Sequence, residues 1–572
     1  MNIVSATDFF VSLQNMKKTT IFIFFCWSLI TCFCQEYDKV KTILNEKGEA
    51  KILVKAKENN IEQLSLLTSI DCKKGNEYLV YVNQKQFNNF LTLGLDYSLY
   101  QEEKNTKSLQ VATSIEQMNQ WNCYPSYQVY VDLMQNLAQE FPDICRLDTI
   151  GFSTENRLIL ALKIYNNTTE NNPKFFYSST MHGDELTGAV VLMRLADYLL
   201  KNHQSNNEIG QLISNMQIYI CPIANPDGVY AGGNNNVSNA TRYNANYVDL
   251  NRNFPNPKYG QHPDGEEHQK ETLAFMQYAL EEDFDLSINL HGGAEVCNYP
   301  WDSWTENQKS HPDKDWFISL CQDFVSQVRT IGGQNYFTDV SYTGITNGGD
   351  WYKIYGSRQD WQNYYTKARE ITLEISTTKT PSSNRLSLYW NYLKDGLIGL
   401  INNSLTGVEG VIKDITNQET ISNATIEVLG LDFDSLFTYS NSQGYYFRPL
   451  LEGNYELKVT AEGYNDTIMN ININNNSTHL QDIYLTPSLT SLLSFSESAN
   501  QPLIYPNPCS DKLFLCSNKF NEYNISNFQR NNLIKQRINK SNEIDVSELP
   551  AGVYFLNLYS KDETKTLIFI KQ

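Results

Sequence analysis

An alternation of short apolar segments with amphipathic ones between residues 118 and 405 limits the fold of this chain more than any other feature of its sequence. Strands are predicted at Leu158–Ile164, Phe175–Thr180, Gln217–Cys221, Leu286–Leu290 and Ile371–Ile375, and a helix at Leu186–Leu200. Strands that alternate with helices are typical of α/β domains, in which helices cover the faces of a sheet. We therefore expect an α/β fold for residues 118–405.

The chain has 572 residues, too many for a single hydrophobic core, and its remaining parts differ from the α/β region. Residues 406–487 contain short β-type segments separated by Gly and Asn turns, which is the pattern of a small β-sandwich. A Ser-rich linker, 488–502, leads to a second β-type region, 503–572. Residues 35–117 carry no recognisable chemistry and are assigned to an N-terminal accessory domain or pro-domain.

Residues 1–34 are interpreted as an export signal with a short upstream extension. The basic pair Lys17-Lys18 precedes the apolar segment Ile21–Phe33, in the order that a signal peptide requires. This segment is too short for a membrane span, so we expect none in the mature protein. Cleavage is expected at the end of the signal, and a lipoprotein signal at Cys32 is the alternative interpretation.

The use of cysteine agrees with export. Of the 11 cysteines, three fall in the signal, and the other eight show no Cys-x-x-Cys spacing, which excludes a zinc ribbon. An oxidising compartment permits disulfides. Cys123 and Cys145 flank a predicted helix, Tyr127–Phe141, and could form a disulfide that joins its two ends, while free buried thiols explain them equally well.

The charge of the chain argues against one class of partner. Lys and Arg number 45 and Asp and Glu number 64, which gives a net charge of −19. Because the phosphate backbone of DNA or RNA repels an acidic surface, no nucleic-acid partner is expected.

Candidate metal ligands lie at the ends of predicted strands. His182 and Glu185 stand three residues apart between a strand and a helix, and imidazole and carboxylate groups are ordinary Zn²⁺ ligands. His268 and Glu271 have the same spacing, but no strand precedes them, so this pair is interpreted as part of the surface. His291 ends another apolar strand and is the best candidate for a third ligand, because α/β sheets place their sites at strand carboxyl ends.

Taken together, the motifs of residues 120–400 resemble those of the zinc metallocarboxypeptidases, in particular the regulatory branch that includes carboxypeptidases D, E, M and N. The motifs are His182-Gly-Asp-Glu185, Asn225-Pro-Asp-Gly228, Arg242-Tyr-Asn-Ala-Asn-Tyr-Val-Asp-Leu-Asn-Arg-Asn-Phe-Pro255, Leu290-His-Gly-Gly293 and Ile371-Thr-Leu-Glu374. The resemblance implies a catalytic domain with a mixed sheet flanked by helices.

The resemblance also implies roles for single residues. His182, Glu185 and His291 would bind one Zn²⁺ per chain. Glu374 would act first as a general base and then as a general acid, a role that suits a carboxylate beside a metal. Arg242 would polarise the scissile carbonyl and stabilise the oxyanion.

Substrate-binding residues follow from the same resemblance. Asn251 and Arg252 match the pair that binds the free α-carboxylate of the substrate, and a guanidinium suits that task because it engages a carboxylate in two parallel hydrogen bonds. Tyr352, 22 residues before Glu374, matches the mobile tyrosine of the family. Arg369 is interpreted as a surface charge.

Two further positions concern specificity. Asp302, 11 residues after the second zinc histidine, matches the acid that selects basic C-terminal residues in the regulatory branch, and Gln359 matches its polar partner. A carboxylate in a pocket would pair with Lys or Arg and would be left unpaired against an apolar side chain. The alternative interpretation of Asp302 is a solvated loop acid. The segment Tyr355–Arg358 departs from the family pattern at the rim of this pocket.

The C-terminal regions resemble known modules as well. Residues 406–487 resemble the transthyretin-like sandwich that follows the catalytic domain in the regulatory carboxypeptidases. Residues 503–572, with Tyr505-Pro-Asn-Pro508, resemble the C-terminal sorting domain of bacterial type IX secretion, which implies that machinery as a partner and a secreted or cell-surface location.

We therefore predict a secreted zinc carboxypeptidase that acts on peptide or protein C-termini and releases Lys or Arg. A zinc amidase acting on peptidoglycan or N-acyl amino acids is one alternative, and a non-catalytic surface-binding protein is another.

Overall fold

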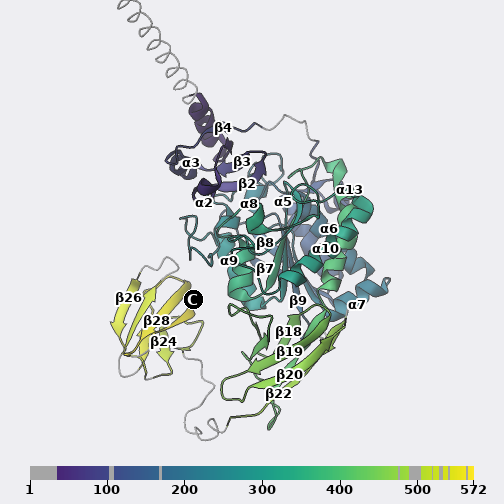
Figure 1. The fold of residues 1–572 in the computed structure, drawn as a ribbon. Coiled ribbons are helices and arrows are strands. Elements are labelled where there is room, and N and C mark those ends of the chain that lie inside the picture. The colour runs from purple at the N-terminus through teal and green to yellow at the C-terminus, as the bar shows by residue number, and fades with distance from the viewer. Residues whose placement is uncertain are drawn as a thin grey trace, which may run out of the picture. The chain divides into compact units, whose positions relative to one another are not determined.

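A computed structural model of the chain is drawn in Figure 1. It describes residues 35–101, 108–166, 171–474, 477–488, 504–517, 519–526, 532–538, 542–561 and 564–571. The predicted signal segment and all but the first residue of the predicted linker lie outside the described residues. The chain divides into two compact units, of which the second combines Phe254–His268 with the chain from Leu405 onward. Each unit is described by itself.

An eight-stranded sheet forms the centre of the first unit, in the order β13-β12-β14-β11-β9-β10-β8-β7. Its strands are β7 (Cys145–Phe152), β8 (Leu158–Ile164), β9 (Lys174–Ser179), β10 (Gln217–Cys221), β11 (Leu286–His291), β12 (Glu295–Tyr299), β13 (Ile345–Asn347) and β14 (Arg369–Ile375). Strands β10, β9, β11 and β14 run parallel, while β12 and β8 run antiparallel to their inner neighbours. The sheet is therefore mixed, as predicted.

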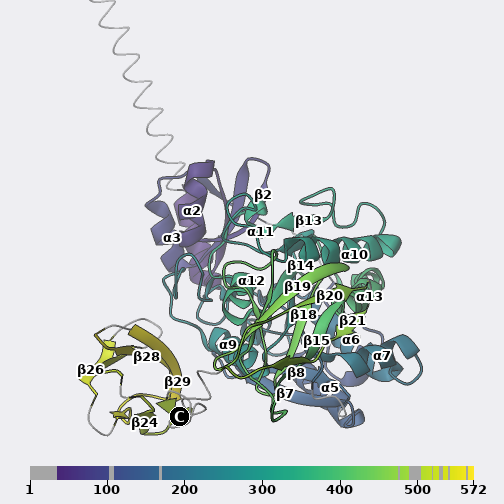
Figure 2. The same ribbon diagram turned by 60° about the horizontal axis from the view of Figure 1, so that its bottom comes forward.

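Helices cover both faces of this sheet. The main ones are α5 (Tyr127–Glu140), α6 (Thr187–Asn202), α9 (Lys270–Glu282), α10 (Lys314–Gly332) and α13 (Leu386–Asn403). Helices α6, α10 and α13 lie side by side on one face, and α9 lies on the other (Figures 1 and 2). Every residue of β10 and β11 is buried, as expected for strands that helices cover on both sides.

One disulfide joins Cys297 of β12 to Cys321 of α10, with their Cα atoms 5.9 Å apart. Cys123 and Cys145 are free and buried, so the disulfide considered for them is wrong and the free-thiol alternative is correct. The Sγ atom of Cys123 lies instead against Met118 Sδ, at 3.6 Å.

The N-terminal region has a small sheet of its own in the order β2-β3-β1-β4. Its elements are β1 (Ala50–Val54), α2 (Glu58–Leu67), β2 (Ser69–Lys74), β3 (Glu77–Val82), α3 (Gln84–Leu91) and β4 (Tyr97–Leu99). The strands pair antiparallel, and their apolar side chains form one core with Leu64 of α2 and with Phe87 and Phe90 of α3. Asn83 and Gln86 form a capping box that begins α3.

The second unit contains all-β regions. Strands β15 (Gly407–Asp414), β18 (Tyr445–Pro449), β21 (Thr478–Leu480) and β22 (Ile483–Leu485) form one sheet, and β16 (Thr425–Val428), β17 (Thr438–Tyr439), β19 (Gly453–Thr460) and β20 (Thr467–Ile473) form another. Both sheets contribute side chains to one hydrophobic core, which includes Val408, Ile426 and Leu457. This two-layer arrangement agrees with the predicted sandwich.

The C-terminal strands form two more sheets around a separate core that includes Leu513, Ile525 and Leu556. They are β23 (Ile504–Tyr505), β24 (Lys512–Leu515), β25 (Glu522–Ser526), β26 (Asn532–Arg537), β27 (Glu543–Asp545), β28 (Gly552–Tyr559) and β29 (Thr564–Lys571).

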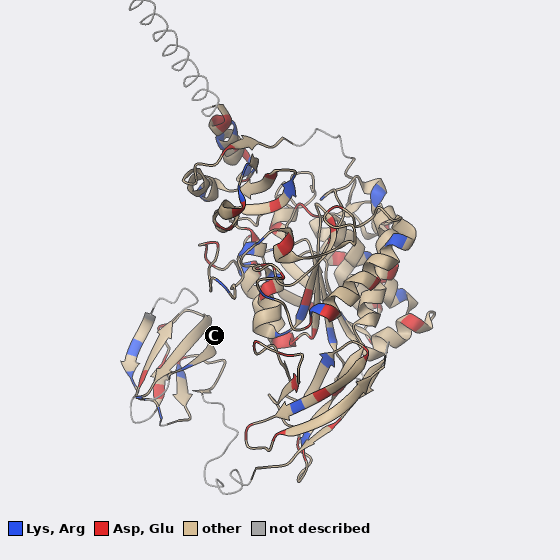
Figure 3. Cartoon of the chain, viewed as in Figure 1, with Lys and Arg blue, Asp and Glu red and all other residues tan. Residues whose placement is uncertain are grey.

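Figure 3 shows acidic residues interspersed with basic ones along the described elements. None of the described helices has the length and apolar character that crossing a membrane requires.

Candidate metal and substrate site

Three neighbouring parallel strands bring the predicted chemistry to one edge of the central sheet. His291 is the last residue of β11 and pairs in register with Glu374 of β14. Strand β9 ends three residues before His182, and Glu185 follows just ahead of α6. Because the carboxyl ends of parallel strands meet at the same edge, residues up to 192 positions apart become neighbours there.

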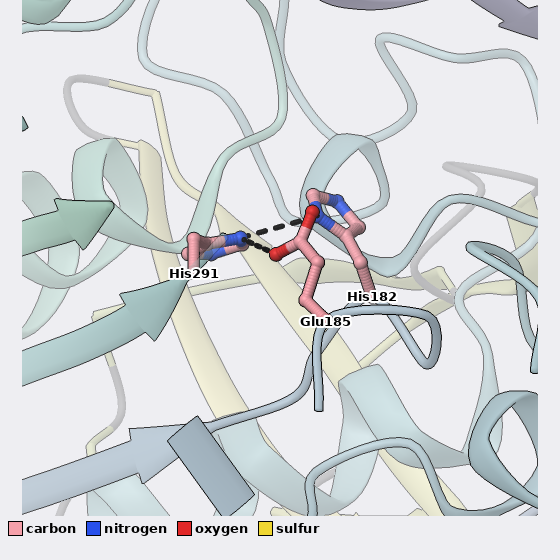
Figure 4. A group of neighbouring side chains, drawn as sticks. All are labelled: His182, Glu185 and His291. Atoms are coloured by element: carbon pink, nitrogen blue, oxygen red, sulfur yellow. Dashed lines mark hydrogen bonds and ion pairs between the residues drawn. The ribbon is translucent and has the colours of Figure 1, made fainter. Parts of the chain in front are cut away.

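His182, Glu185 and His291 point toward one another (Figure 4). The Nδ1 atom of His291 lies 2.9 Å from Glu185 Oε2 and 3.1 Å from His182 Nδ1. His182 Nδ1 lies 2.9 Å from Glu185 Oε1. All three side chains are buried. Among the described residues, no other group of at least three His, Cys, Asp or Glu side chains is close enough together to hold a metal ion. Two imidazoles and a carboxylate are a zinc donor set.

Two residues that the sequence analysis did not assign contact these candidate ligands. Asp249 Oδ1 lies 3.1 Å from His182 Nε2, and its other oxygen accepts from Arg242 Nε at 2.9 Å. The side-chain amide of Asn289 lies 2.7 Å from His291 Nε2. Such contacts fix the orientation of a ligating ring. The position of Asn289 could have been inferred from the sequence, because Asn289 lies two residues before His291 on one strand and such residues face the same side.

The turn that carries His182 is held by close backbone packing. A Cβ atom at Gly183 would lie 2.3 Å from the carbonyl carbon of Gly228, so only glycine fits there. The side chain of Asn225 donates to the carbonyl of Met181 at 3.2 Å. The Asn225–Gly228 motif therefore holds the backbone of the turn that carries His182.

Thr180, directly after β9, has a φ of 62°, which a β-branched residue rarely adopts. Its hydroxyl donates to the carbonyl of Pro222 at 3.2 Å, a bond that helps to hold this strained position. Backbone strain of this kind collects at functional sites.

Glu374 lies in the same cleft as the three ligands. Its Oε2 atom is buried and has no hydrogen-bond partner among the described residues. Burial, and then repulsion by Glu185, raises the pKa of Glu374 well above its usual range. A carboxylate oxygen without a hydrogen-bond partner, next to the candidate metal ligands, is free to accept a hydrogen bond from a bound water molecule or substrate.

The charges of the ligands also suit a metal. Burial alone would raise the pKa of Glu185, but Lys379, His182 and His291 together hold it well below its usual range. The Nζ atom of Lys379 lies 2.9 Å from Glu185 Oε1. Burial lowers the pKa of His291 to about 4, so its imidazole is neutral at pH 7, the form that binds metals.

The predicted substrate residues Arg242, Asn251, Arg252 and Tyr352 line the same cleft. Asn251 and Arg252 belong to the 3₁₀ helix η1 (Leu250–Arg252), which Asp249 caps. Asn251 Oδ1 accepts from the backbone N–H of Arg358 at 3.0 Å, and Arg252 Nη1 donates to the carbonyl of Asn251 at 2.9 Å. The segment that departs from the family pattern thus helps to position Asn251.

Asp302 lines the cleft as well and is 2% exposed, so its interpretation as a solvated loop acid is wrong. Its Oδ1 atom accepts from Gln359 Nε2 at 3.0 Å and from Asn298 Nδ2 at 3.3 Å. Burial raises the pKa of Asp302 to about 6. A Cβ atom at Gly348 would lie 2.0 Å from this oxygen, so glycine is needed there.

Two predictions of surface charge are wrong. Arg369, the first residue of β14, is buried and forms an ion pair with Asp313 at 3.0 Å. Glu271, in α9, is also buried and accepts from the backbone N–H of Thr154 at 2.8 Å. Arg369 is thus paired with an opposite charge and Glu271 is hydrogen-bonded inside the fold, and neither residue lines the cleft.

Comparison with known proteins agrees with this geometry. A family model described as zinc carboxypeptidase matches residues 130–395, and one described as secretion system C-terminal sorting domain matches residues 503–572. The sorting domain indicates a secreted or cell-surface location.

Several curated proteins are similar to the chain. Carboxypeptidase M of Mus musculus is 34% identical over 353 residues, which cover 59% of this chain and 78% of that protein. The carboxypeptidase N catalytic chain of Rattus norvegicus is 34% identical over 405 residues, covering 64% and 86%. Carboxypeptidase D of Mus musculus is 32% identical over 362 residues, covering 61% of this chain but only 26% of that protein, so the chain spans about a quarter of its length. The chain belongs to the zinc carboxypeptidase family.

Proposed function

We propose that the protein is a secreted, zinc-dependent carboxypeptidase that hydrolyses the last peptide bond of peptides and proteins and releases C-terminal Lys or Arg. The observation that carries this proposal is a single cleft that is lined by three metal ligands, a carboxylate with an open oxygen, two arginines and a buried acid.

In this proposal His182, Glu185 and His291 hold one Zn²⁺ per chain. When bound, the zinc ion supplies a Lewis acid for the scissile carbonyl and lowers the pKa of a water molecule. The imidazole of His291 is neutral and the carboxylate of Glu185 is ionised, so neither group has to release a proton in order to bind the metal.

Glu374 moves the proton. It accepts a proton from the attacking water and returns that proton to the leaving amine, and the rise of its pKa through burial and repulsion by Glu185 strengthens it as a base. Arg242, oriented by Asp249, donates to the carbonyl oxygen as negative charge develops on it.

The remaining cleft residues restrict the reaction to chain ends. Asn251 and Arg252 bind the terminal carboxylate, and a guanidinium and an amide together provide enough donors for both oxygens. Tyr352 donates a hydrogen bond to the bound peptide backbone. A substrate without a free carboxylate would leave the Arg252 charge unpaired, which disfavours internal cleavage.

Asp302 would select the released residue, with Gln359 holding its carboxylate in place. A Lys or Arg side chain in the pocket pairs with this buried charge, and the low local dielectric strengthens the attraction. An apolar side chain would leave the same charge unpaired, and this unfavourable state lowers the affinity for peptides that end in an apolar residue.

The β-regions complete the proposal. We assign residues 406–487 as a transthyretin-like sandwich and residues 503–572 as the tail that the type IX secretion machinery recognises.

The test is hydrolysis of matched peptides that end in Arg, Lys, Phe or Leu, with and without a zinc chelator. We expect the chelator to abolish all activity and kcat/KM to be highest for Arg and Lys. Asp302→Ala should remove that preference, while Asp323→Ala, a change of an exposed acid on α10, should keep it. Equal rates for Arg and Phe would contradict the assigned specificity, and cleavage of N-acyl amino acids in place of peptides would favour an amidase.

A further inference from the structure

Asp302, the acid assigned to specificity, lies on the loop between β12 and α10, and a second acid binds the backbone of this loop. Asp360 Oδ1 accepts from the backbone N–H of Asp302 at 2.8 Å. Asp360 Oδ2 accepts from the backbone N–H of Ser303 at 3.0 Å and lies 2.5 Å from Ser303 Oγ. Asp360 and Ser303 are fully buried. One carboxyl group therefore holds two consecutive residues of the loop.

The element that carries Asp360 contacts Asp302 at a second point. Gln359 and Asp360 are consecutive residues of α12 (Arg358–Trp361), and Gln359 Nε2 donates to the carboxylate of Asp302 at 3.0 Å. The side chain of Ser357 caps α12, because it accepts from the backbone N–H of Asp360 at 3.3 Å. Helix α12 thus binds both the main chain and the side chain of Asp302, which fixes the position and the direction of its carboxylate.

The carbonyl groups of the same loop have partners in another segment. The backbone N–H of Gly349 donates to the carbonyl of Trp301 at 2.8 Å, and that of Ile354 donates to the carbonyl of Asp302 at 3.2 Å. Removing the Asp360 side chain would take an acceptor away from the N–H groups of residues 302 and 303. A buried N–H group that loses its acceptor costs free energy, and a displacement of the loop would relieve this cost.

Asp360 and Asp302 differ in their relation to the cleft. Asp302 lines the cleft, whereas Asp360 does not. Burial, and then repulsion by Asp302, raises the pKa of Asp360 to about 8, so Asp360 is mostly neutral near pH 7. A proton on Oδ2 can be donated to Ser303 Oγ, while both oxygens still accept from the two backbone N–H groups. Asp360 can therefore hold the loop without adding a second full negative charge beside Asp302.

We propose that Asp360 is a positioning residue for the recognition of C-terminal Lys and Arg, because it holds the backbone of Asp302 and Ser303 and so directs the Asp302 carboxylate toward the cation of the substrate. This inference rests on the proposed function. A displaced carboxylate loses its charge-assisted hydrogen bonds to an ammonium or guanidinium group. An apolar side chain makes no such bond, so the loss of Asp360 affects the two classes of substrate differently.

The test compares Asp360→Ala and Asp360→Asn in the full chain, with matched peptides that end in Arg or Leu. In Asp360→Ala we expect the ratio of kcat/KM for Arg to that for Leu to fall by tenfold or more, mainly through a higher KM for the Arg peptide. Asn keeps an acceptor for the backbone N–H of Asp302, so Asp360→Asn should have an intermediate ratio. Because both peptides are measured on one sample, a smaller fraction of folded enzyme would leave the ratio unchanged.

Asp285→Ala is the matched control. Asp285 also accepts from a backbone N–H group, that of Lys174, at 2.9 Å. It directly precedes β11 and so lies at the opposite end of that strand from His291. The ratio in this variant should equal that of the wild type. Backbone hydrogen exchange gives a readout without activity, and exchange at residues 302 and 303 should be faster in Asp360→Ala and unchanged in the control.

An equal fall of kcat/KM for both peptides in Asp360→Ala, or an unchanged ratio, would overturn the positioning role. Equal hydrolysis of both peptides by the wild type would contradict the proposed specificity instead. In that case faster exchange at residues 302 and 303 in Asp360→Ala would still support the hold of Asp360 on the loop, and exchange at the wild-type rate would overturn it.

Discussion

At the scale of single residues, burial decides which acids can carry out chemistry. Asp302 is buried and Glu374 is partly buried, and burial raises the pKa of each. Glu374 keeps an oxygen without a hydrogen-bond partner among the described residues, whereas Asp302 accepts bonds from Gln359 and Asn298. The first arrangement suits proton transfer, and the second suits a fixed charge that recognises a cation.

Glu374→Gln tests the role in proton transfer. The amide has the same shape but cannot accept the proton, so we expect unchanged zinc content and a fall in kcat/KM of about a thousandfold, or roughly 4 kcal/mol of transition-state stabilisation. Metal analysis and peptide hydrolysis on the same sample measure both quantities. Activity close to that of the wild type would place the base elsewhere.

The pKa of Asp302 predicts how specificity depends on pH. Burial raises this pKa to about 6, so the group is neutral below that pH and anionic above it. The ratio of kcat/KM for a peptide ending in Arg to that for one ending in Leu should therefore increase between pH 5 and pH 7.5. Asp302→Asn should have a low ratio that does not change with pH. A constant ratio in the wild type would remove Asp302 from this role.

The sequence singled out the candidate ligands and most candidate substrate residues through local motifs, and it singled out Tyr352 and Asp302 through their distance along the chain from a motif. It did not reveal that Asp249 and Asn289 orient the histidines, since their roles depend on contacts with His182 and His291. The burial of Arg369 was missed for a similar reason, because its partner Asp313 lies 56 residues away in sequence.

At the scale of elements, strand ends and tight turns position the site. The boundaries of β8 and β10 agree with their predicted ranges, since runs of apolar residues define them. The parallel pairing that sets His291 opposite Glu374 could not be predicted from periodicity, because it depends on the order of strands in the sheet.

The turn at Gly183 allows a direct test of this positioning. An added Cβ atom would meet the backbone of Gly228 at 2.3 Å, and backbone cannot move aside as a flexible side chain can. Gly183→Ala should therefore displace His182 and weaken zinc affinity by tenfold or more, with a lower Tm. In Gly552→Ala the nearest atom lies 3.6 Å away, so both quantities should stay unchanged. Full zinc affinity in Gly183→Ala would show that the turn adapts.

At the scale of the whole molecule, the chain combines a catalytic region with a sorting domain and an N-terminal sheet that contacts the cleft. The sequence indicated the first two through motifs. It could not decide between an accessory domain and a pro-domain for residues 35–117, because Asp71 and Arg242 are 171 residues apart and no local pattern announces their contact.

Metal analysis of the purified protein measures whether His182, Glu185 and His291 hold one zinc ion per chain. The wild type should contain one equivalent of zinc, and His291→Ala should lose most of it. His268→Ala is the matched control, because His268 and Glu271 have the spacing of the ligand motif but lie outside the trio. We predict full zinc in the control and little in His291→Ala; full zinc in His291→Ala would contradict the account.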